Sequence, residues 1–393
     1  MESSHPVEET VIIGAGLAGL TVAYHLRDRG IDPLVLDRGA SLGSSWRSRH
    51  PQLTLNTHRS VSHLPALRYP DKTPAFPRRD DVVRHLEDFA LKHRFRVRSG
   101  VDVFSISQQA AAFRLETGEG VIVARSVVVA TGRDSRPIEP LIDGIETFSG
   151  ERLHASEFGD AKRYAGRRIL VIGGGNSGFD IVNHLARVPE TRTWLSIRSG
   201  SAVLPKRLRG IAVHRLSPLM DLLPARMSDL AIALTQRLAF GDVRKLGLPG
   251  SPKGAATRLR DEHVAIPVDD GAIRSIREGK AETVPEVVSV DRARVHLKGG
   301  DVIEPDIIIL ATGYSADLGN VLADIGVIDT RGNPIVERDR VSCSIPGLLF
   351  AGMTPGLVSY FRNAHREGRV IARAVARRSQ ALDIVRMRTL AGY

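Results

Sequence analysis

The stretch TVIIGAGLAGLTVAYHL (residues 10–26) decides the fold class of this 393-residue chain. A short apolar run ends at Gly14, and Gly14, Gly16 and Gly19 open a segment with helical periodicity. The first glycine permits a tight turn, the second lets the backbone approach a pyrophosphate, and the third lets the helix pack against the strand. The free N–H groups at the start of the helix attract phosphates. The stretch therefore predicts a strand, turn and helix that bind a dinucleotide.

The next strand supports this interpretation. PLVLD (33–37) ends at Asp37, close to the spacing of about 20 residues at which an acid accepts hydrogen bonds from ribose hydroxyls. Arg38 follows at the same edge and is a further candidate for cofactor binding. A strand–helix–strand unit of this kind predicts a buried parallel sheet.

A second stretch, RILVIGGGNSGFDIV (168–182), repeats the pattern far along the chain. The residues that it offers to a second nucleotide are Gly173, Gly175, Asn176, Ser177 and Gly178.

The strand that follows the second loop ends differently. WLSIRSG (194–200) places Arg198 and Ser199 where an acid would stand in an NAD site. A cation and a hydroxyl suit a ribose 2′-phosphate, which an acid would repel. We therefore expect FAD at the first loop and NADPH at the second. The alternative is that Arg198 is only an exposed charge at a strand end.

Two loops imply an α/β fold with two Rossmann-like domains. We predict a discontinuous FAD domain (1–158 and 308–393) with an inserted NADPH domain (159–307), whose helical region at about 203–250 caps a substrate cavity. That region could instead touch a membrane surface. Two further strands end in ATG turns, in which Thr131 and Thr312 are expected to shape the crossovers between the domains.

Composition narrows the functional classes. The single cysteine, Cys343, excludes a redox pair of cysteines and hence a dithiol reductase. The net charge of +11 is scattered among acids, so we expect no nucleic-acid partner and interpret it mainly as solvated surface. No secretory signal or long apolar run is visible, and no histidine spacing is typical of a metal site. We expect a cytoplasmic protein without a transmembrane anchor or a metal, and a homodimer is left open.

Between the loops, FSGERLHASEF (148–158) fits the fingerprint F-x-G-x-x-x-H-x-x-x-[FY]. Here the chain resembles the class B flavin-dependent monooxygenases, the flavin-containing monooxygenase group. The resemblance extends in order over nearly the whole chain, through GSSW, LNTHRSVSHLPALRYP, ILATGY and GLLFAGM. SAVLPKRLRG, GDVRKLGLPGSPKG and IPVDDGAIRSIREGKAETVPEV are most similar to the YUCCA-like branch and its bacterial relatives.

The resemblance implies an enzyme that uses FAD, NADPH and O2. NADPH would reduce the flavin, and the flavin C4a-(hydro)peroxide formed with oxygen would transfer one oxygen atom to a small organic substrate. The reaction would be N- or S-oxygenation, hydroxylation, or YUCCA-like oxidative decarboxylation of an α-keto acid. A Baeyer–Villiger oxygenation, or an NADPH oxidase or redox sensor that oxygenates nothing, remains an alternative.

The resemblance also assigns roles to single residues. Asn56 falls where the flavin-containing monooxygenases carry an active-site asparagine, although it could simply cap a turn. His154 of the fingerprint is expected to position a linker rather than to transfer protons. Trp46, Gly352 and Met353 are expected near the flavin.

Two departures from the family pattern stand out. The usual GGxW is Gly43-Ser44-Ser45-Trp46 here, and Phe158-Gly159 replaces the Trp-Pro of the Baeyer–Villiger fingerprint. The second departure disfavours a typical Baeyer–Villiger enzyme.

Overall fold

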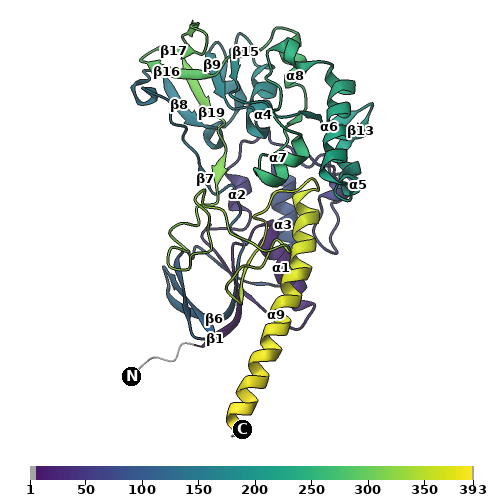
Figure 1. Cartoon of the computed structure of the whole chain (residues 1–393), viewed down its shortest axis with the longest axis vertical. Coiled ribbons are helices and arrows are strands. Elements are labelled where there is room, and N and C mark those ends of the chain that lie inside the picture. The colour runs from purple at the N-terminus through teal and green to yellow at the C-terminus, as the bar shows by residue number, and fades with distance from the viewer. Residues whose placement is uncertain (1–5, 392–393) are drawn as a thin grey trace.

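The computed structural model describes residues 6–391, which form two lobes stacked along the long axis of the molecule (Figure 1). The lower lobe in that view is built on a seven-stranded sheet. Its strands, in spatial order, are β3 (Arg96–Ser99), β2 (Leu34–Asp37), β1 (Val7–Ile13), β6 (Gly120–Val129), β5 (Ala112–Thr117) and β4 (Val103–Gln109), with β21 (Leu348–Phe350) also paired to β6.

The parallel part of this sheet brings the predicted cofactor residues to one edge. Strands β1, β2, β3, β6 and β21 are parallel, while β4 and β5 extend β6 in an antiparallel sense. Ile13 pairs with Leu36 on one side and with Val129 on the other. The first glycine loop, Asp37 and the first ATG turn therefore follow neighbouring strand ends, which is where α/β sheets bind ligands.

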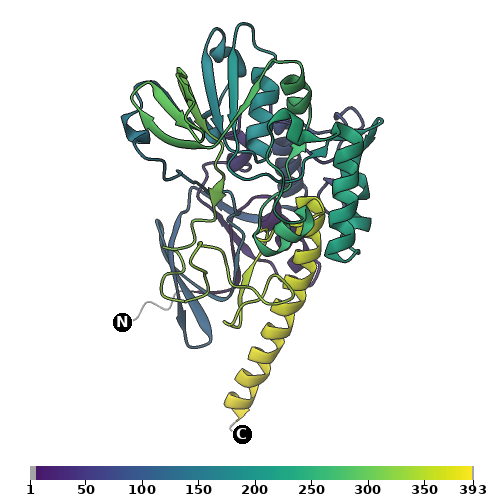
Figure 2. The ribbon, with the colours of Figure 1, turned by 45° about the horizontal axis from the view of Figure 1, so that its top comes forward.

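Three helices cover one face of the first sheet: α1 (Leu17–Arg27), α3 (Arg79–His93) and α9 (Tyr360–Ala391). Leu20, Leu86 and Ile371 from these helices pack in one apolar cluster with Ile12 and Val128 from the sheet. Helix α9 packs along α1. In both ribbon views it runs from the middle of the molecule down the side of the lower lobe (Figures 1 and 2). The C-terminal part of the chain therefore returns to the first lobe.

The upper lobe is built on a second, fully parallel sheet. Its spatial order is β15 (Glu282–Val284), β10 (Arg192–Ser196), β9 (Arg168–Ile172), β19 (Ile307–Leu310) and β8 (Glu151–His154). Helices α4 (Asn176–Leu185) and α8 (Ala272–Arg277) contribute to the apolar cluster on one face. A small antiparallel sheet of β16 (Val287–Asp291), β17 (Arg294–Leu297) and β18 (Val302–Ile303) packs on the other face.

The chain crosses between the lobes twice, at adjacent positions. The short strands β7 (Arg136–Pro137) and β20 (Tyr314–Ser315) pair in an antiparallel sense at these crossovers. The boundaries predicted at 158/159 and 307/308 cut the second sheet, because β8 and most of β19 lie on their FAD side yet pair within the upper lobe. We propose instead that the inserted domain spans about 138–313.

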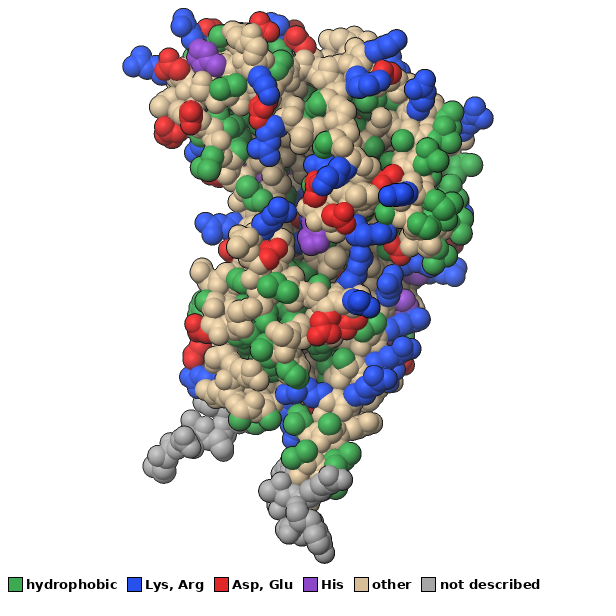
Figure 3. Space-filling model, in the orientation of Figure 1, with side chains coloured by type: hydrophobic (Ala, Val, Ile, Leu, Met, Phe, Trp, Pro, Cys, Tyr) green, Lys and Arg blue, Asp and Glu red, His purple; other side chains and the backbone are tan. Residues whose placement is uncertain are grey.

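The region expected to be a helical cap forms the outer side of the upper lobe. It contains β11 (Leu204–Pro205), β12 (Arg207–Leu208), β13 (Ile211–Ala212), α5 (Ser217–Met220) and α6 (Ala225–Phe240), and it is followed by α7 (Ala255–Asp261) and β14 (Val268–Asp269). Figure 3 shows apolar side chains gathered over α5 and α6 at the right edge of the molecule. The remaining short elements are α2 (Ser44–Arg47) and the 3-10 turns η1 (Arg59–Val61), η2 (Ile145–Thr147), η3 (Ala155–Glu157), η4 (Ala161–Tyr164), η5 (Val213–Leu216) and η6 (Val243–Leu246).

Among residues 6–391, no helix is both long enough and apolar enough to cross a membrane.

Candidate functional site

The three glycines of the first loop differ in their surroundings. Two are required by close contacts within the protein, and one faces open space. A Cβ atom at Gly14 would lie 2.4 Å from the carbonyl oxygen of Ala130, and one at Gly19 would lie 1.8 Å from that of Gly14. At Gly16, which caps α1 without a side-chain hydrogen bond, a Cβ atom would meet nothing within 4 Å. The loop thus leaves a cradle beside the free N–H groups of α1, which fits the pyrophosphate of FAD.

Asp37 is held at this cradle by two backbone donors. The N–H of Ala15 donates to its Oδ2 atom at 2.6 Å, and the N–H of Gly39 donates to its Oδ1 atom at 2.7 Å. Each carboxylate oxygen retains a lone pair that can accept a ribose hydroxyl. Arg38 is exposed beside Asp37, and Trp46 packs partly buried against the apolar cluster of the first lobe.

The glycines of the second loop show the same contrast between close contacts and open space. A Cβ atom at Gly173 would lie 2.3 Å from the carbonyl oxygen of Ala311, and one at Gly178 would lie 1.9 Å from that of Gly173. A Cβ atom at Gly175, the N-cap of α4, would meet nothing within 4 Å. Asn176 and Ser177 form the first turn of α4. The second loop therefore offers a second pyrophosphate cradle with the same geometry.

The strand register refines the prediction about NADPH. The N–H of Gly14 donates to the carbonyl oxygen of Leu36 at 2.6 Å, and that of Gly173 donates to Ser196 at 2.9 Å. Ile197 therefore occupies the position that Asp37 has in the first lobe. Arg198 stands one residue later than the sequence analysis expected, and exposed Ser199 follows it.

The surroundings of Arg198 leave it available to a ligand. Its side chain is 82% exposed, and its nearest acidic partner is Glu286, with Nε 3.9 Å from Oε1. An apolar residue in place of the acid removes a negative charge that would repel a 2′-phosphate. We retain as a proposal that Arg198 binds this phosphate.

Asn56 lies at the contact between the two lobes. Its Nδ2 atom donates to Oδ1 of Asn176 at 2.9 Å, and the same oxygen accepts the N–H of Val268 at 3.0 Å. The Nδ2 atom of Asn176 donates to the carbonyl oxygen of Ile266 at 3.4 Å. The predicted active-site asparagine thus contacts the first residue of the helix that follows the second loop.

His154 links the two crossovers. Its Nδ1 atom accepts the N–H of Ser156 at 3.1 Å, so its Nε2 atom carries the proton and donates to the carbonyl oxygen of Gly313 at 3.2 Å. Burial lowers the pKa of His154, and its hydrogen bond to Gly313 opposes this effect. These contacts suit the positioning role expected from the sequence.

The threonines of the two ATG turns differ in their surroundings. Thr312 Oγ1 donates to the carbonyl oxygen of Ile138 at 2.5 Å, while Thr131 is exposed.

Gly352 and Met353 lie close to the start of α1. A Cβ atom at Gly352 would be 2.8 Å from the Cβ atom of Ala18, and Met353 is buried. The N–H of Gly352 donates to Oε2 of Glu367 on α9 at 2.7 Å. Glu367 is only 3% exposed, and this burial raises its pKa to about 7. Glu367 is not recognisable as a site residue from the sequence, because a lone acid in an amphipathic helix carries no signal of burial.

Lys206 is a second residue at this site that no sequence motif indicates. Its buried ammonium donates to Oγ1 of Thr54 at 2.7 Å and to Oδ2 of Asp270 at 2.9 Å, and it lies 4.8 Å from the centroid of the Phe76 ring. It thereby ties the upper lobe to the segment that carries Asn56. In the sequence, Lys206 stands out only by its place within the SAVLPKRLRG stretch.

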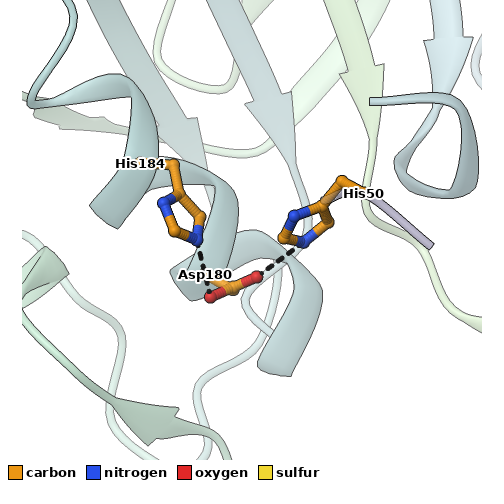
Figure 4. A group of neighbouring side chains, drawn as sticks. All are labelled: His50, Asp180 and His184. Carbon is orange, nitrogen blue, oxygen red and sulfur yellow. Dashed lines mark hydrogen bonds and ion pairs between the residues drawn. The ribbon is translucent and has the colours of Figure 1, made fainter. Parts of the chain in front are cut away.

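A further contact between the lobes involves His50, Asp180 and His184 (Figure 4). Both histidines direct Nε2 at the Asp180 carboxylate, at 2.8 Å from His50 and 3.4 Å from His184. Burial acts against ionisation of Asp180, but its hydrogen bonds to the two histidines keep its pKa below the ordinary value.

These three side chains are also the one group in the described part of the chain whose ligand atoms, all within 4.8 Å of one another, could hold a metal ion. A tetrahedral zinc ion would hold its ligand atoms about 3.3 Å apart. The spacing of 2.8 Å between His50 and Asp180 is that of a direct hydrogen bond. We therefore interpret the group as a hydrogen-bonded latch between the lobes.

Two sheets, each with parallel strands that end at an open glycine loop, define the class: an oxidoreductase that binds two dinucleotides. The family model described as pyridine nucleotide-disulphide oxidoreductase matches residues 11–218. Among solved structures, the chain is similar to a flavin-containing monooxygenase from Stenotrophomonas maltophilia (TM-score 0.74, 22% identity, 95% of this chain and 98% of that one). It also resembles cyclohexanone monooxygenase from Rhodococcus bound to NADP⁺ (TM-score 0.72, 18% identity, 96% of this chain and 85% of that one).

Curated relatives narrow the class. The chain is 33% identical over 332 residues to the indole-3-pyruvate monooxygenase YUCCA1 of Oryza sativa subsp. japonica, covering 83% of this chain and 81% of the relative. It is 31% identical over 346 residues to the probable indole-3-pyruvate monooxygenase YUCCA3 of Arabidopsis thaliana, covering 84% and 78%. The chain therefore belongs to the class B flavin monooxygenases, with YUCCA enzymes among its relatives. It is an NADPH-dependent flavin monooxygenase that uses FAD.

Proposed function

We propose that this monooxygenase converts a small aryl 2-oxo acid into the carboxylic acid that is one carbon shorter. Relatives named indole-3-pyruvate monooxygenases support this substrate class, since they match more than four fifths of the chain. The balanced reaction consumes the 2-oxo acid, O2, NADPH and a proton. It yields the shorter acid with one oxygen atom from O2, together with CO2, NADP⁺ and water.

The observation that supports a monooxygenase site, whichever substrate it takes, is the contact between Asn56 and Asn176. It brings an amide from the lower lobe against Asn176, the first residue of the helix that follows the second glycine loop, where we expect NADPH to bind. Bound FAD supplies the oxygen-activating chemistry. The chain's own task is to hold the nicotinamide, flavin and substrate together and to exclude water. Lys206 assists by fixing Thr54, two residues before Asn56.

The test is a substrate panel with the purified holoenzyme under ¹⁸O2. Indole-3-pyruvate and phenylpyruvate should each give one labelled shorter acid and one CO2 for each NADPH consumed. A tertiary amine, a thioether and a cyclic ketone should give little product. Release of all the electrons as hydrogen peroxide with every compound would instead identify an oxidase, and the proposal would be wrong.

A second candidate is N- or S-oxygenation, which the presence of Asn56 favours. Product from the amine or thioether without CO2 from the 2-oxo acids would identify it. Asn56→Ala serves as a site control in both cases. It should raise the hydrogen peroxide formed for each NADPH several-fold while FAD content, measured by absorbance, stays unchanged.

A further inference from the structure

The outer surface of the cap region carries an unusual concentration of exposed apolar side chains. Eight of the twenty exposed large hydrophobic residues in the described chain fall between 211 and 238. We call them the apolar face: Ile211, Leu216, Leu219, Leu222, Met227, Leu230, Leu234 and Leu238. Large contiguous patches of this kind on a protein surface mark sites of interaction.

Helix α6 shows why this face is not part of the core. Met227, Leu230, Leu234 and Leu238 recur at intervals of three and four residues and so form one stripe along the helix. The inner side of α6 is already packed, since Ser228 and Ile232 are buried. The stripe therefore faces outward as a second apolar surface of the same helix.

Helix α9 presents a row of exposed arginines that adjoins this face. Its members are spaced by four, three, four and four residues, which places them on one side of the helix. We call them the arginine stripe: Arg362, Arg366, Arg369, Arg373 and Arg377. Arg366 Nη1 lies 3.3 Å from Oδ2 of Asp221, which directly follows α5. Figure 3 shows both surfaces on the right edge of the molecule, with the apolar face above the basic side chains.

We propose that the apolar face and the arginine stripe together bind the surface of an anionic lipid bilayer. The apolar side chains would enter the boundary between headgroups and acyl chains, and the arginines would contact the lipid phosphates. A helix that lies on a membrane combines an apolar face with basic side chains. Here α6 supplies the apolar stripe and α9 supplies the basic row.

Charge argues against a second copy of the chain as the occupant. The apolar face itself is interspersed with Arg215, Arg226 and Arg237. Of the two acids between residues 207 and 240, Asp221 pairs with Arg366, and Asp229 accepts the N–H groups of Ala256 and Thr257. A two-fold contact through this face would therefore place like charges together without acids to offset them.

The test is co-sedimentation of the full-length holoenzyme with two kinds of vesicle, phosphatidylcholine alone and phosphatidylcholine with phosphatidylglycerol at 7:3. We expect at least about tenfold stronger partitioning onto the anionic vesicles, because each arginine near such a surface adds electrostatic attraction to the lipid phosphates. High salt should reduce it. Absence of binding to the anionic vesicles would overturn the proposal.

Two pairs of variants separate the contributions. Leu230→Gln with Leu234→Gln, and Arg369→Gln with Arg373→Gln, should each weaken binding to the anionic vesicles by about tenfold or more. The matched controls Val288→Gln and Arg294→Gln alter exposed residues of the small sheet β16–β18 and should bind like the wild type. An effect of the arginine pair alone would reduce the contact to simple charge attraction and contradict the proposal. Loss of a dimer in light scattering on changing the leucines would instead identify a second copy as the occupant.

Discussion

At the scale of the residue, the glycines of each loop have different tasks. Gly14 and Gly19 are required by close backbone contacts within the protein itself, whereas Gly16 faces open space. The same division holds for Gly173 and Gly175. We therefore expect a substitution at an open glycine to affect a bound ligand rather than the fold.

Gly16→Val tests the FAD cradle. A valine Cβ atom meets no other atom of the protein within 4 Å, but the side chain would fill the space in which we expect the pyrophosphate. We expect a folded but colourless protein, as judged by circular dichroism and by absorbance of the flavin. Gly175→Val is the matched control and should retain FAD while its KM for NADPH rises at least tenfold. Full FAD occupancy in Gly16→Val would show that the cofactor is placed wrongly.

Arg198→Ala tests the choice between NADPH and NADH. A hydrogen bond to a charged group contributes roughly 1.5–3 kcal/mol, and solvent screening of an exposed arginine favours the lower end of that range. We expect the ratio of kcat/KM for NADPH to that for NADH to fall about tenfold, with NADH use unchanged. Arg192→Ala, an exposed arginine at the opposite end of β10, is the control. An unaltered ratio in Arg198→Ala would rule out this arginine as the phosphate ligand.

At the scale of the element, α9 supplies the buried acid that meets the closing GLLFAGM motif. Asn363 Nδ2 donates to Oε1 of Glu367 at 3.0 Å, one turn away on the same helix, and Gly352 donates to the other oxygen. Both donors are neutral, so they offset only part of the cost of burying a charge. The pKa of Glu367 is consequently raised to about 7.

Glu367→Gln should reveal this cost as a pH dependence of stability. A carboxyl group whose pKa is raised by folding stabilises the protein fully below its unfolded pKa, near 4.5, and loses this contribution as the pH rises through about 7. The variant should therefore gain up to about 3 kcal/mol relative to the wild type between those pH values. Denaturant unfolding of both proteins at pH 4.5 and pH 8 measures this difference in the free energy of unfolding. Glu146→Gln, at an exposed acid of η2, should show no such gain.

At the scale of the whole molecule, the sequence predicted local features better than distant contacts. Both glycine loops and their helices are readable because each motif lies within about one strand and one helix. The membership of β8 in the upper sheet was not predicted, since it depends on pairing with β19, more than 150 residues later. The hydrogen bond between Lys206 and Thr54 joins residues 152 positions apart. No periodic pattern in the sequence indicates such a contact.

The paired crossovers β7 and β20 have a consequence for how such a chain can be assembled. Both ends of the inserted domain emerge side by side, at Pro137 and Tyr314. A segment with adjacent ends can be added to a surface loop of a host domain without separating the strands of the host sheet. We therefore expect that recombination can exchange the insert at about 138–313 between related flavoproteins as one segment, and that the coenzyme preference would move with it.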